Sequence, residues 1–318
     1  MWRPNVKRLF ALLGANLLIS GLLGGPAMAQ DLSASAPPLM KPGLAALLSA
    51  ELSEFSGTGG LWLKSLNTGV EVSVRGDQHF DSASTIKMAV MVLAFRLADE
   101  HKLDLSERYT IQASDYRGGS GIFRYNDPGL NPTLRDVITQ MVITSDNSAT
   151  DIMISKVGGK EAVNAFLEAQ GFKTLHLNMP TYDYFRRSAA DLQRPFDEKT
   201  WLGIVSPAEM GKLIEGIQEG TIASKASCAE MLRIMRAQQS GTRKMPHWLS
   251  VPVAHKTGET RGVTNDVGVI YARSGPIVVA FYTIGYTGLA SDADDRIGRV
   301  ARLIVEYFDG PPAPRPGG

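Results

Sequence analysis

Three short segments of the sequence place hydroxyl, amine and amide side chains at spacings that suit nucleophilic chemistry. The first is DSASTIKMAV, residues 81–90, in which Ser84 and Lys87 are three positions apart. Positions i and i+3 of a helix share one face, so the lysine amine is placed to take the serine proton. A lysine in the first helical turn opposes the helix dipole, which favours a chemical role. Taken alone, the pair also fits a capped helix with a solvated lysine.

The other two segments supply further polar groups in a fixed order. Ser145, Asp146 and Asn147 lie in a break between two helical patterns, 133–143 and 148–157. Lys256-Thr257-Gly258 lies further along, on a segment with the composition of a β-strand. Each segment alone is an ordinary cap, turn or strand end. All three in this order, each on a suitable element, indicate one catalytic site.

The elements that must position these segments predict an α/β fold with two lobes. Strand patterns occur near both ends of the chain, at 61–76 and 251–286, and they predict one antiparallel sheet. Helical periodicity predicts terminal helices that cover this sheet and an inserted all-helical lobe. Thr133 with Asp136, and Ser206 with Pro207, are typical helix starts. Further helical patterns occupy 43–55, the segment opened by Asp81 or Ser82, 161–171, 226–238 and the C-terminal DADDRIGRVARLIVEYF, and an irregular stretch covers 173–205.

The ends of the chain have the composition of processing segments and tails. Residues 1–29 combine basic residues, an apolar run and an Ala-x-Ala sequence, which together predict a signal peptide cleaved after Ala29. We therefore expect an exported protein, periplasmic or secreted, with no stable membrane insertion after cleavage. Residues 30–42 and the Pro-rich 309–318 are predicted to be flexible. The domain between them, 43–308, divides into a sheet lobe (43–82 and 216–308) and a helical lobe (83–215).

The charge and the cysteine and histidine content narrow the classes of function. The sequence has 33 basic and 32 acidic residues, interspersed, so no basic stripe indicates a nucleic-acid partner. Cys228 is the only cysteine, which excludes an internal disulfide. The five histidines lack metal-ligand spacing. We expect no metal, no cofactor and a monomer that acts on a small molecule.

The three segments together resemble those of the class A β-lactamases and the related penicillin-binding serine hydrolases, which share Ser-x-x-Lys, Ser-Asp-Asn and Lys-Thr-Gly. The similarity extends to GGSGIFRYNDPGLNPTLRDVITQMVITSDNSATDIMI and HKTGETRGVTNDVGVIYA, and covers about 43–308. It implies the same two-lobe fold. It also implies an exported serine hydrolase whose substrate is a β-lactam or a D-Ala-type peptide.

The resemblance implies a role for each matching residue. Ser84 would be the nucleophile, Lys87 would move its proton, and Ser145 would pass a proton to the leaving nitrogen. Asn147 would bind the substrate amide and Lys87. Lys256, with Thr257 and Gly258, would bind the substrate carboxylate, and the backbone N–H groups of Ser84 and Glu259 would form the oxyanion hole.

The sequence departs from the class A pattern at the residue that activates the deacylating water. No Glu-x-x-Leu-Asn occurs in 173–205, and Asp183 is the acidic residue nearest the expected place. Asp183 is therefore a candidate base, or else a loop carboxylate paired with Arg186 or Arg187. Three activities remain open: a class A-like β-lactamase, a DD-peptidase-like or other amidase or esterase with slow lactam turnover, and a lactam-binding sensor that stays acylated.

Overall fold

The structure is a computed structural model that describes residues 43–187, 189–194 and 196–311. The predicted signal peptide, the segment 30–42 and the tail from residue 312 onward lie outside the described residues. The described residues all belong to one compact unit. In this part of the chain, no helix has both the length and the apolar character needed to cross a bilayer.

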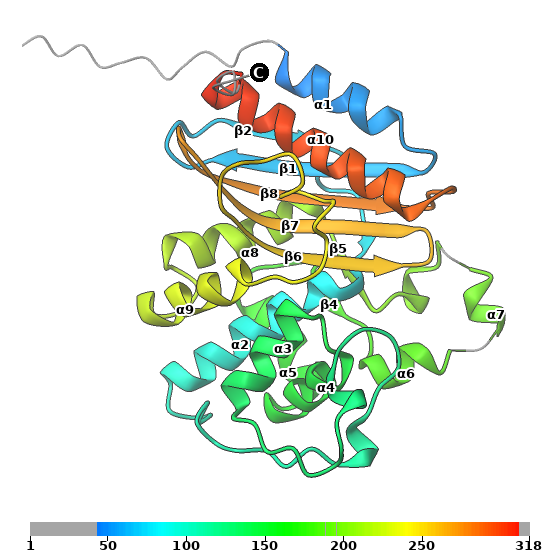
Figure 1. Ribbon diagram of the computed structural model, residues 1–318, viewed down its shortest axis with the longest axis vertical. Coiled ribbons are helices and arrows are strands. Elements are labelled where there is room, and N and C mark those ends of the chain that lie inside the picture. Colours follow the sequence, from blue (N-terminus) through cyan, green and yellow to red (C-terminus); the bar gives the residue numbers. More distant parts are fainter. Residues whose placement is uncertain (1–42, 188, 195, 312–318) are drawn as a thin grey trace, which may run out of the picture. The chain divides into compact units, whose positions relative to one another are not determined.

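The centre of the unit is a five-stranded antiparallel sheet with the strand order β2-β1-β8-β7-β6 (Figure 1). Its strands are β1 (Thr58–Ser65), β2 (Glu71–Val74), β6 (Val253–Thr260), β7 (Val263–Ala272) and β8 (Gly275–Ile284). Segments from both ends of the chain therefore pair side by side, β1 with β8, as the strand patterns predicted. The β1–β2 connection contains Gly69 in the left-handed region, at a φ of 70°.

Helices cover both faces of this sheet. The outer face packs against α1 (Leu44–Ser53) and α10 (Ala290–Asp309), which form one hydrophobic cluster with it (Figure 1). On the other face, α8 (Pro207–Glu219) packs on β1, β7 and β8, and α9 (Lys225–Arg236) packs on β6. Residues 207–215 therefore contact the sheet, although the sequence analysis placed them in the helical lobe. The cause is the apolar face of α8, where Met210, Leu213, Ile214 and Ile217 are fully buried.

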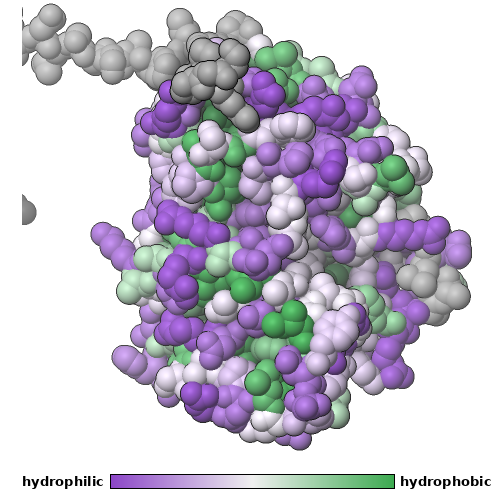
Figure 2. Space-filling view, viewed as in Figure 1, coloured by the Kyte–Doolittle hydropathy of each residue, from purple (hydrophilic) through white to green (hydrophobic). Residues whose placement is uncertain are grey.

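The helical lobe is built around α2 (Lys87–Asp99), which is apolar on all sides from Met88 to Phe95 and is buried there. Around it lie α3 (Leu134–Ile143), α4 (Asn147–Lys156) and α5 (Gly159–Ala169). The predicted start of α3 is confirmed: the Thr133 side chain accepts a hydrogen bond from Asp136 N, and Asp136 accepts one from Thr133 N. On the face shown in Figure 2, hydrophilic and hydrophobic residues are interspersed over both lobes.

A small second sheet joins the entry of α2 to the segment that the sequence predicted as irregular. Its order is β3-β5-β4, formed by Phe80–Asp81, Gly203–Val205 and His176–Leu177. The same segment contains two short helices, α6 (Thr181–Phe185) and α7 (Ala189–Leu192). The remaining short elements are the 3-10 turns η1 (Ala83–Ile86), η2 (Ala113–Asp115), η3 (Phe123–Tyr125) and η4 (Glu198–Thr200).

Candidate active site

Ser84 lies in η1, the single helical turn that leads into α2 and packs against strand β6. Gly258 allows this close approach. A Cβ at position 258 would lie 2.9 Å from Ser82 O and 3.2 Å from the Ala83 Cβ. The glycine of Lys-Thr-Gly is therefore required sterically, because any side chain would push β6 away from the serine turn.

The turn before Ser84 has an unfavourable backbone conformation that is held by hydrogen bonds. Ala83 has a φ of 43°, in a region that costs a non-glycine residue about 1–3 kcal/mol. Its N–H donates to Asp81 Oδ1 at 2.9 Å, and Asn265 Nδ2 donates to Asp81 O at 2.9 Å. Burial raises the pKa of Asp81 to about 6, against the lowering effect of the Ala83 hydrogen bond. Asp81 and Asn265 thus fix the direction in which Ser84 faces.

Lys87 is fully buried at the start of α2, and its amine is surrounded by oxygen atoms. The Nζ atom lies 2.6 Å from Ser145 O, 2.8 Å from Asn147 Oδ1 and 3.1 Å from Ser145 Oγ. None of the hydrogen bonds among the described residues joins Lys87 Nζ to Ser84 Oγ. Hydrogen bonds of catalytic groups often shorten only when substrate is bound, so this geometry is compatible with proton transfer between the two.

Ser145 connects the two lobes through its hydroxyl. Its Oγ lies 3.1 Å from Lys87 Nζ and 3.1 Å from Lys256 Nζ, the second lysine being on β6. Ser145 has a φ of 56°, a further left-handed non-glycine residue. A hydroxyl has one proton to donate and two lone pairs to accept with, so Ser145 can pass a proton between its neighbours.

Asp146 and Asn147 hold the Ser145 segment against a neighbouring loop. Asp146 caps α4 through Ala149 N at 2.9 Å, and its other oxygen accepts from Ile122 N and Phe123 N at 2.6 and 2.8 Å. Asn147 Nδ2 donates to Gly118 O at 2.8 Å while Oδ1 receives Lys87. The buried carboxylate of Asp146 therefore has a structural role, and Asn147 faces the site.

Burial lowers the pKa of both lysines. The pKa of Lys87 falls to about 7, although the negative charges of Asp146 and Asp151 raise it. Burial, followed by the positive charges of Lys87 and Lys244, holds the pKa of Lys256 well below its usual range. At neutral pH the site therefore contains a lysine amine able to accept a proton.

Ser84, Ser145 and Asn147 open into a cavity of about 320 Å³ between the lobes. Its wall carries many hydroxyl groups. The lining residues are Ala83, Ser84, Gly119, Ser120, Thr144, Ser145, Asn147, Thr181, Tyr184, Phe185, Leu202, Ser240, Thr257, Glu259 and Thr260. The structure thus brings together eight of the predicted site residues. Five of them line the cavity: Ser84, Ser145, Asn147, Thr257 and Glu259. The other three, Lys87, Lys256 and Gly258, lie directly behind this wall.

Lys256 differs from its expected placement. From the sequence, Lys256 was expected to face the cleft from a strand end and to help bind a substrate carboxylate. Instead β6 is covered by η1 and α9, and Lys256 is fully buried, with Nζ donating to Ser145 Oγ and to Thr257 O at 2.7 Å. Direct contact with a substrate carboxylate would require one of these bonds to break.

Asp183 does not lie in the Ser84 cavity, which corrects its proposed role as a base. It is exposed on α6 and lines a different cavity, of about 570 Å³, together with Arg117 and Asp151. Thr181 and Tyr184, three positions apart on α6, are the buried residues that face the Ser84 cavity, so Asp183 faces elsewhere. The alternative ion pair with Arg186 or Arg187 is also absent among the described residues.

Several cavity residues had no motif to identify them. Ser120 Oγ donates to Ser145 O at 2.8 Å, and Ser240 Oγ lies 2.7 Å from Thr257 Oγ1. Thr181 is held by Asp151, which accepts from Thr181 N at 2.7 Å and Oγ1 at 2.8 Å. These hydroxyls come from three segments that are far apart in the sequence, one of them the start of α6, so no spacing along the chain could reveal them.

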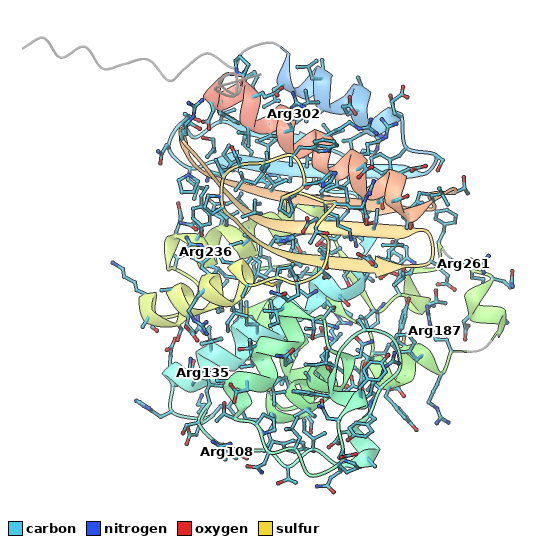
Figure 3. All side chains as sticks on the ribbon, viewed as in Figure 1. Arg108, Arg135, Arg187, Arg236, Arg261 and Arg302 are labelled. Carbon is cyan, nitrogen blue, oxygen red and sulfur yellow. The ribbon has the colours of Figure 1, made fainter. Side chains whose placement is uncertain are left out.

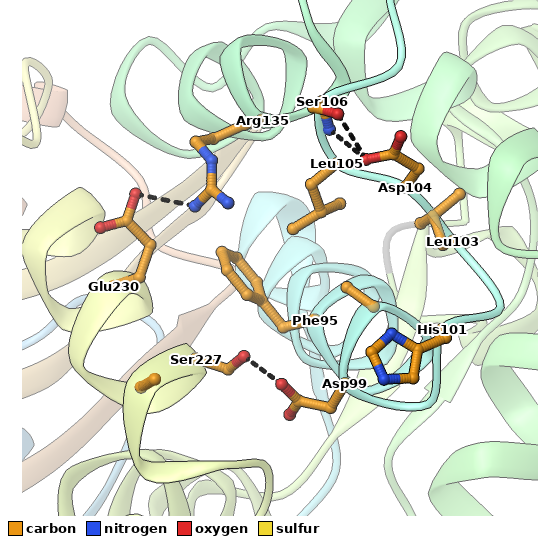
Figure 4. Close-up of a pocket in the computed structure, with 12 residues that line it drawn as sticks. Phe95, Asp99, His101, Leu103, Asp104, Leu105, Ser106, Arg135, Ser227 and Glu230 are labelled. Carbon is orange, nitrogen blue, oxygen red and sulfur yellow. Dashed lines mark hydrogen bonds and ion pairs between the residues drawn. The ribbon is translucent and has the colours of Figure 1, made fainter.

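A roomier cavity of about 780 Å³ lies between α2 of the helical lobe and α9, which packs on the sheet (Figure 4). Its charged groups have partners. Asp99 accepts hydrogen bonds from Ser224 and Ser227 at the start of α9, and Arg135 donates to Glu230 at 3.2 Å. None of the motif residues lines this cavity, so the active-site assignment rests on the smaller one.

Comparison with known proteins identifies the family of the chain. The family model of the β-lactamase enzyme family (Beta-lactamase2) matches residues 43–308. β-Lactamase CTX-M-8 of Citrobacter amalonaticus is 25% identical over 314 residues, which cover 97% of this chain and 100% of that protein. A β-lactamase structure from Sphaerobacter thermophilus is 29% identical, with a TM-score of 0.74 over 85% of this chain and 98% of that one. A structure of a PBP-A mutant as an acyl-enzyme complex with penicillin G is 27% identical, with a TM-score of 0.74 over 83% and 96%.

The lowered pKa of Lys87 predicts the pH dependence of the reaction at Ser84. Because the amine must be neutral to accept a proton, the acylation rate should fall about tenfold per pH unit below the Lys87 pKa of about 7. Stopped-flow acylation across pH 5 to 9 measures this. Lys87→Met should slow acylation by about 10²-fold or more. A rate that is independent of pH in this range, or a fully active Lys87→Met protein, would contradict the role.

The position of Asp183 predicts that it has no part in deacylation. Asp183→Asn should clear an acyl adduct at the parent rate, within about twofold, since surface substitutions away from a site have small effects. Intact mass spectrometry after a penicillin pulse follows the adduct. Asp127→Asn, which changes an exposed carboxylate that lines neither cavity, serves as the control. Selective accumulation of the adduct in Asp183→Asn would restore Asp183 to the mechanism.

Proposed function

The chain belongs to the β-lactamase enzyme family, and from this membership and the site geometry we propose that it hydrolyses β-lactam amides through an acyl-enzyme on Ser84. One observation carries the assignment to this residue. Ser84 opens into the cavity from a fixed turn, and directly behind it Lys87 has a pKa of about 7 and contacts Ser145 and Asn147.

In the proposed acylation step, Lys87 accepts the Ser84 hydroxyl proton as the oxygen attacks the lactam carbonyl carbon. The C–N bond then breaks, and Ser145 passes a proton from the lysines to the leaving nitrogen. The negative oxygen formed during attack is stabilised by two backbone N–H groups, those of Ser84 and Glu259. Ser84 lies in a first helical turn, whose N–H groups lack acceptors within the helix, and β6 is an edge strand with one side unpaired.

A second candidate function is supported by the lining of the cavity. Among the described residues that line it, Glu259 is the only carboxylate, and it is paired with Lys244. Asp183, the expected base, lies in another cavity. This arrangement favours slow hydrolysis of the acyl-enzyme, as in a DD-peptidase-like enzyme whose physiological substrate is a peptide amide. The lifetime of a penicilloyl adduct distinguishes this candidate from the β-lactamase.

The proposal predicts a covalent adduct on Ser84. Incubation with penicillin G should increase the intact mass by one penicillin molecule, and Ser84→Ala should show no increase. Peptide mapping identifies the modified residue, and Ser82→Ala, in the same turn, serves as the control. An adduct that forms in Ser84→Ala, or hydrolysis of a chromogenic lactam by that variant, would contradict the assignment. An adduct that clears within seconds favours the β-lactamase, and one that persists for hours favours the slower enzyme.

We also propose that the protein acts outside the cytoplasm, after removal of residues 1–29. The support is the sequence alone: Arg3, Lys7 and Arg8, an apolar run, and the Ala-x-Ala sequence that ends at Ala29. Expression of the full chain in a Gram-negative host should yield a periplasmic protein whose N-terminal residue is Gln30. A cytoplasmic product that retains Met1 would exclude this proposal.

A further inference from the structure

The wall of the Ser84 cavity has an unusual charge for a site expected to bind an anion. Among the described residues that line it, Glu259 is the only one charged at neutral pH, and none is a lysine or arginine. Lys87 and Lys256 are fully buried behind the wall. An approaching ligand therefore meets hydroxyl groups and one carboxylate.

The Glu259 carboxylate is held in place by a buried lysine. Lys244 Nζ donates to Glu259 Oε1 at 2.6 Å and lies 3.8 Å from Asp294 Oδ1. The Lys244 side chain is 0% exposed, whereas that of Glu259 is 57% exposed. Partial burial raises the pKa of Glu259, but the charge and hydrogen bond of Lys244 outweigh this and lower it, so the group stays ionised. The pair presents its negative end to the cavity and its positive end to the interior.

No exposed cation in the described wall offsets this charge. Arg261 lies in the β6–β7 turn (Figure 3), and the half-buried Arg187 stacks on the Tyr184 ring, 3.5 Å from its centroid, and donates to Tyr184 O. Both line a neighbouring cavity of about 400 Å³ that contains Asp81, not the Ser84 cavity. Ser240 and Thr257, whose hydroxyls are 2.7 Å apart, supply neutral donors on the same side of the site as Lys244.

We propose that Glu259 determines substrate charge at this site. It disfavours substrates with a carboxylate beside β6 and favours those that are neutral or cationic there, such as lactams or peptide amides whose carboxyl is esterified or amidated. This inference rests on the proposed acylation of Ser84. The physical basis is Coulomb repulsion between Glu259 and a substrate carboxylate in a cavity only partly open to water.

The test compares acylation by penicillin G with acylation by its methyl ester, in the parent and in Glu259→Gln. The two lactams differ only in the charge of one carboxyl group. Glu259 and a substrate carboxylate carry like charges, and their repulsion is reduced by water and by Lys244, so we expect the acid-to-ester rate ratio to rise about 3- to 10-fold in Glu259→Gln. Glutamine keeps the size of the side chain and the backbone N–H. Using a ratio cancels any effect on the oxyanion hole that both lactams share.

Glu168→Gln is the matched control, because it removes one exposed carboxylate on α5, outside the cavity lining. Its ratio should equal that of the parent. A second measurement varies the salt: raising ionic strength from about 0.01 M to about 1 M shortens the screening length from about 30 Å to about 3 Å. In the parent, this should raise the acid-to-ester ratio, and in Glu259→Gln it should change the ratio less.

The outcomes separate the two levels of the account. An unchanged ratio in Glu259→Gln, with Ser84 acylated normally, overturns the role of Glu259 and leaves the proposed function intact. If Glu259→Gln does not fold, the parent alone decides: an acid-to-ester ratio that does not change with ionic strength overturns the role of Glu259. If neither lactam acylates Ser84 in the parent, the proposed function fails, and the inference about Glu259 fails with it.

Discussion

The site depends on a lysine that is buried completely at the start of a helix. Burying Lys87 lowers its pKa to about 7, from an ordinary value of 10.5. The folded state therefore binds this proton less tightly than the unfolded chain. The stability cost grows as pH falls from about 10.5 to about 7 and is constant below that. In return, the protein has an amine that is a proton acceptor at neutral pH, within reach of a serine hydroxyl.

The surrounding structure holds this amine by bringing both lobes to one hydroxyl group. Lys87 comes from α2, Ser145 from the segment before α4, and Lys256 from β6 in the sheet. Ser145 Oγ lies 3.1 Å from the amines of both lysines. Two residues, Ala83 and Ser145, adopt left-handed conformations that are unfavourable for side chains. Such strain is tolerated because Asp81, Asn265, Ser120 and Lys87 bond to the strained segments.

Much of this arrangement could be predicted from the sequence. Apolar periodicity located the main helices, and strand composition at both ends of the chain predicted the sheet in which β1 pairs with β8. The order of the three motifs predicted that Ser84, Lys87, Ser145 and Asn147 belong to one site, and the structure places them together. Strands β3 and β4 have two residues each, too few to show any alternation. The sequence therefore could not reveal the small sheet.

Two errors have a common origin in reading position along the chain as position in space. Asp183 was selected by its distance from Ser145, but the helical turn of α6 places Thr181 and Tyr184 inward and Asp183 outward. Lys256 was expected to face the cleft from a strand end, but β6 is covered by η1 and α9 and the side chain is fully buried. The pairing of Glu259 with Lys244 is also invisible in the sequence, because the partners are on different elements.

The central claim is that Lys87 loses its charge near neutral pH inside the folded protein. Nuclear magnetic resonance titration of the lysine side chains, with the Lys87 signal assigned by its loss in Lys87→Met, measures this pKa directly. We predict a Lys87 signal that titrates near pH 7, well below the ordinary lysine pKa of 10.5. A Lys87 signal that remains that of a charged amine up to pH 10 would contradict it.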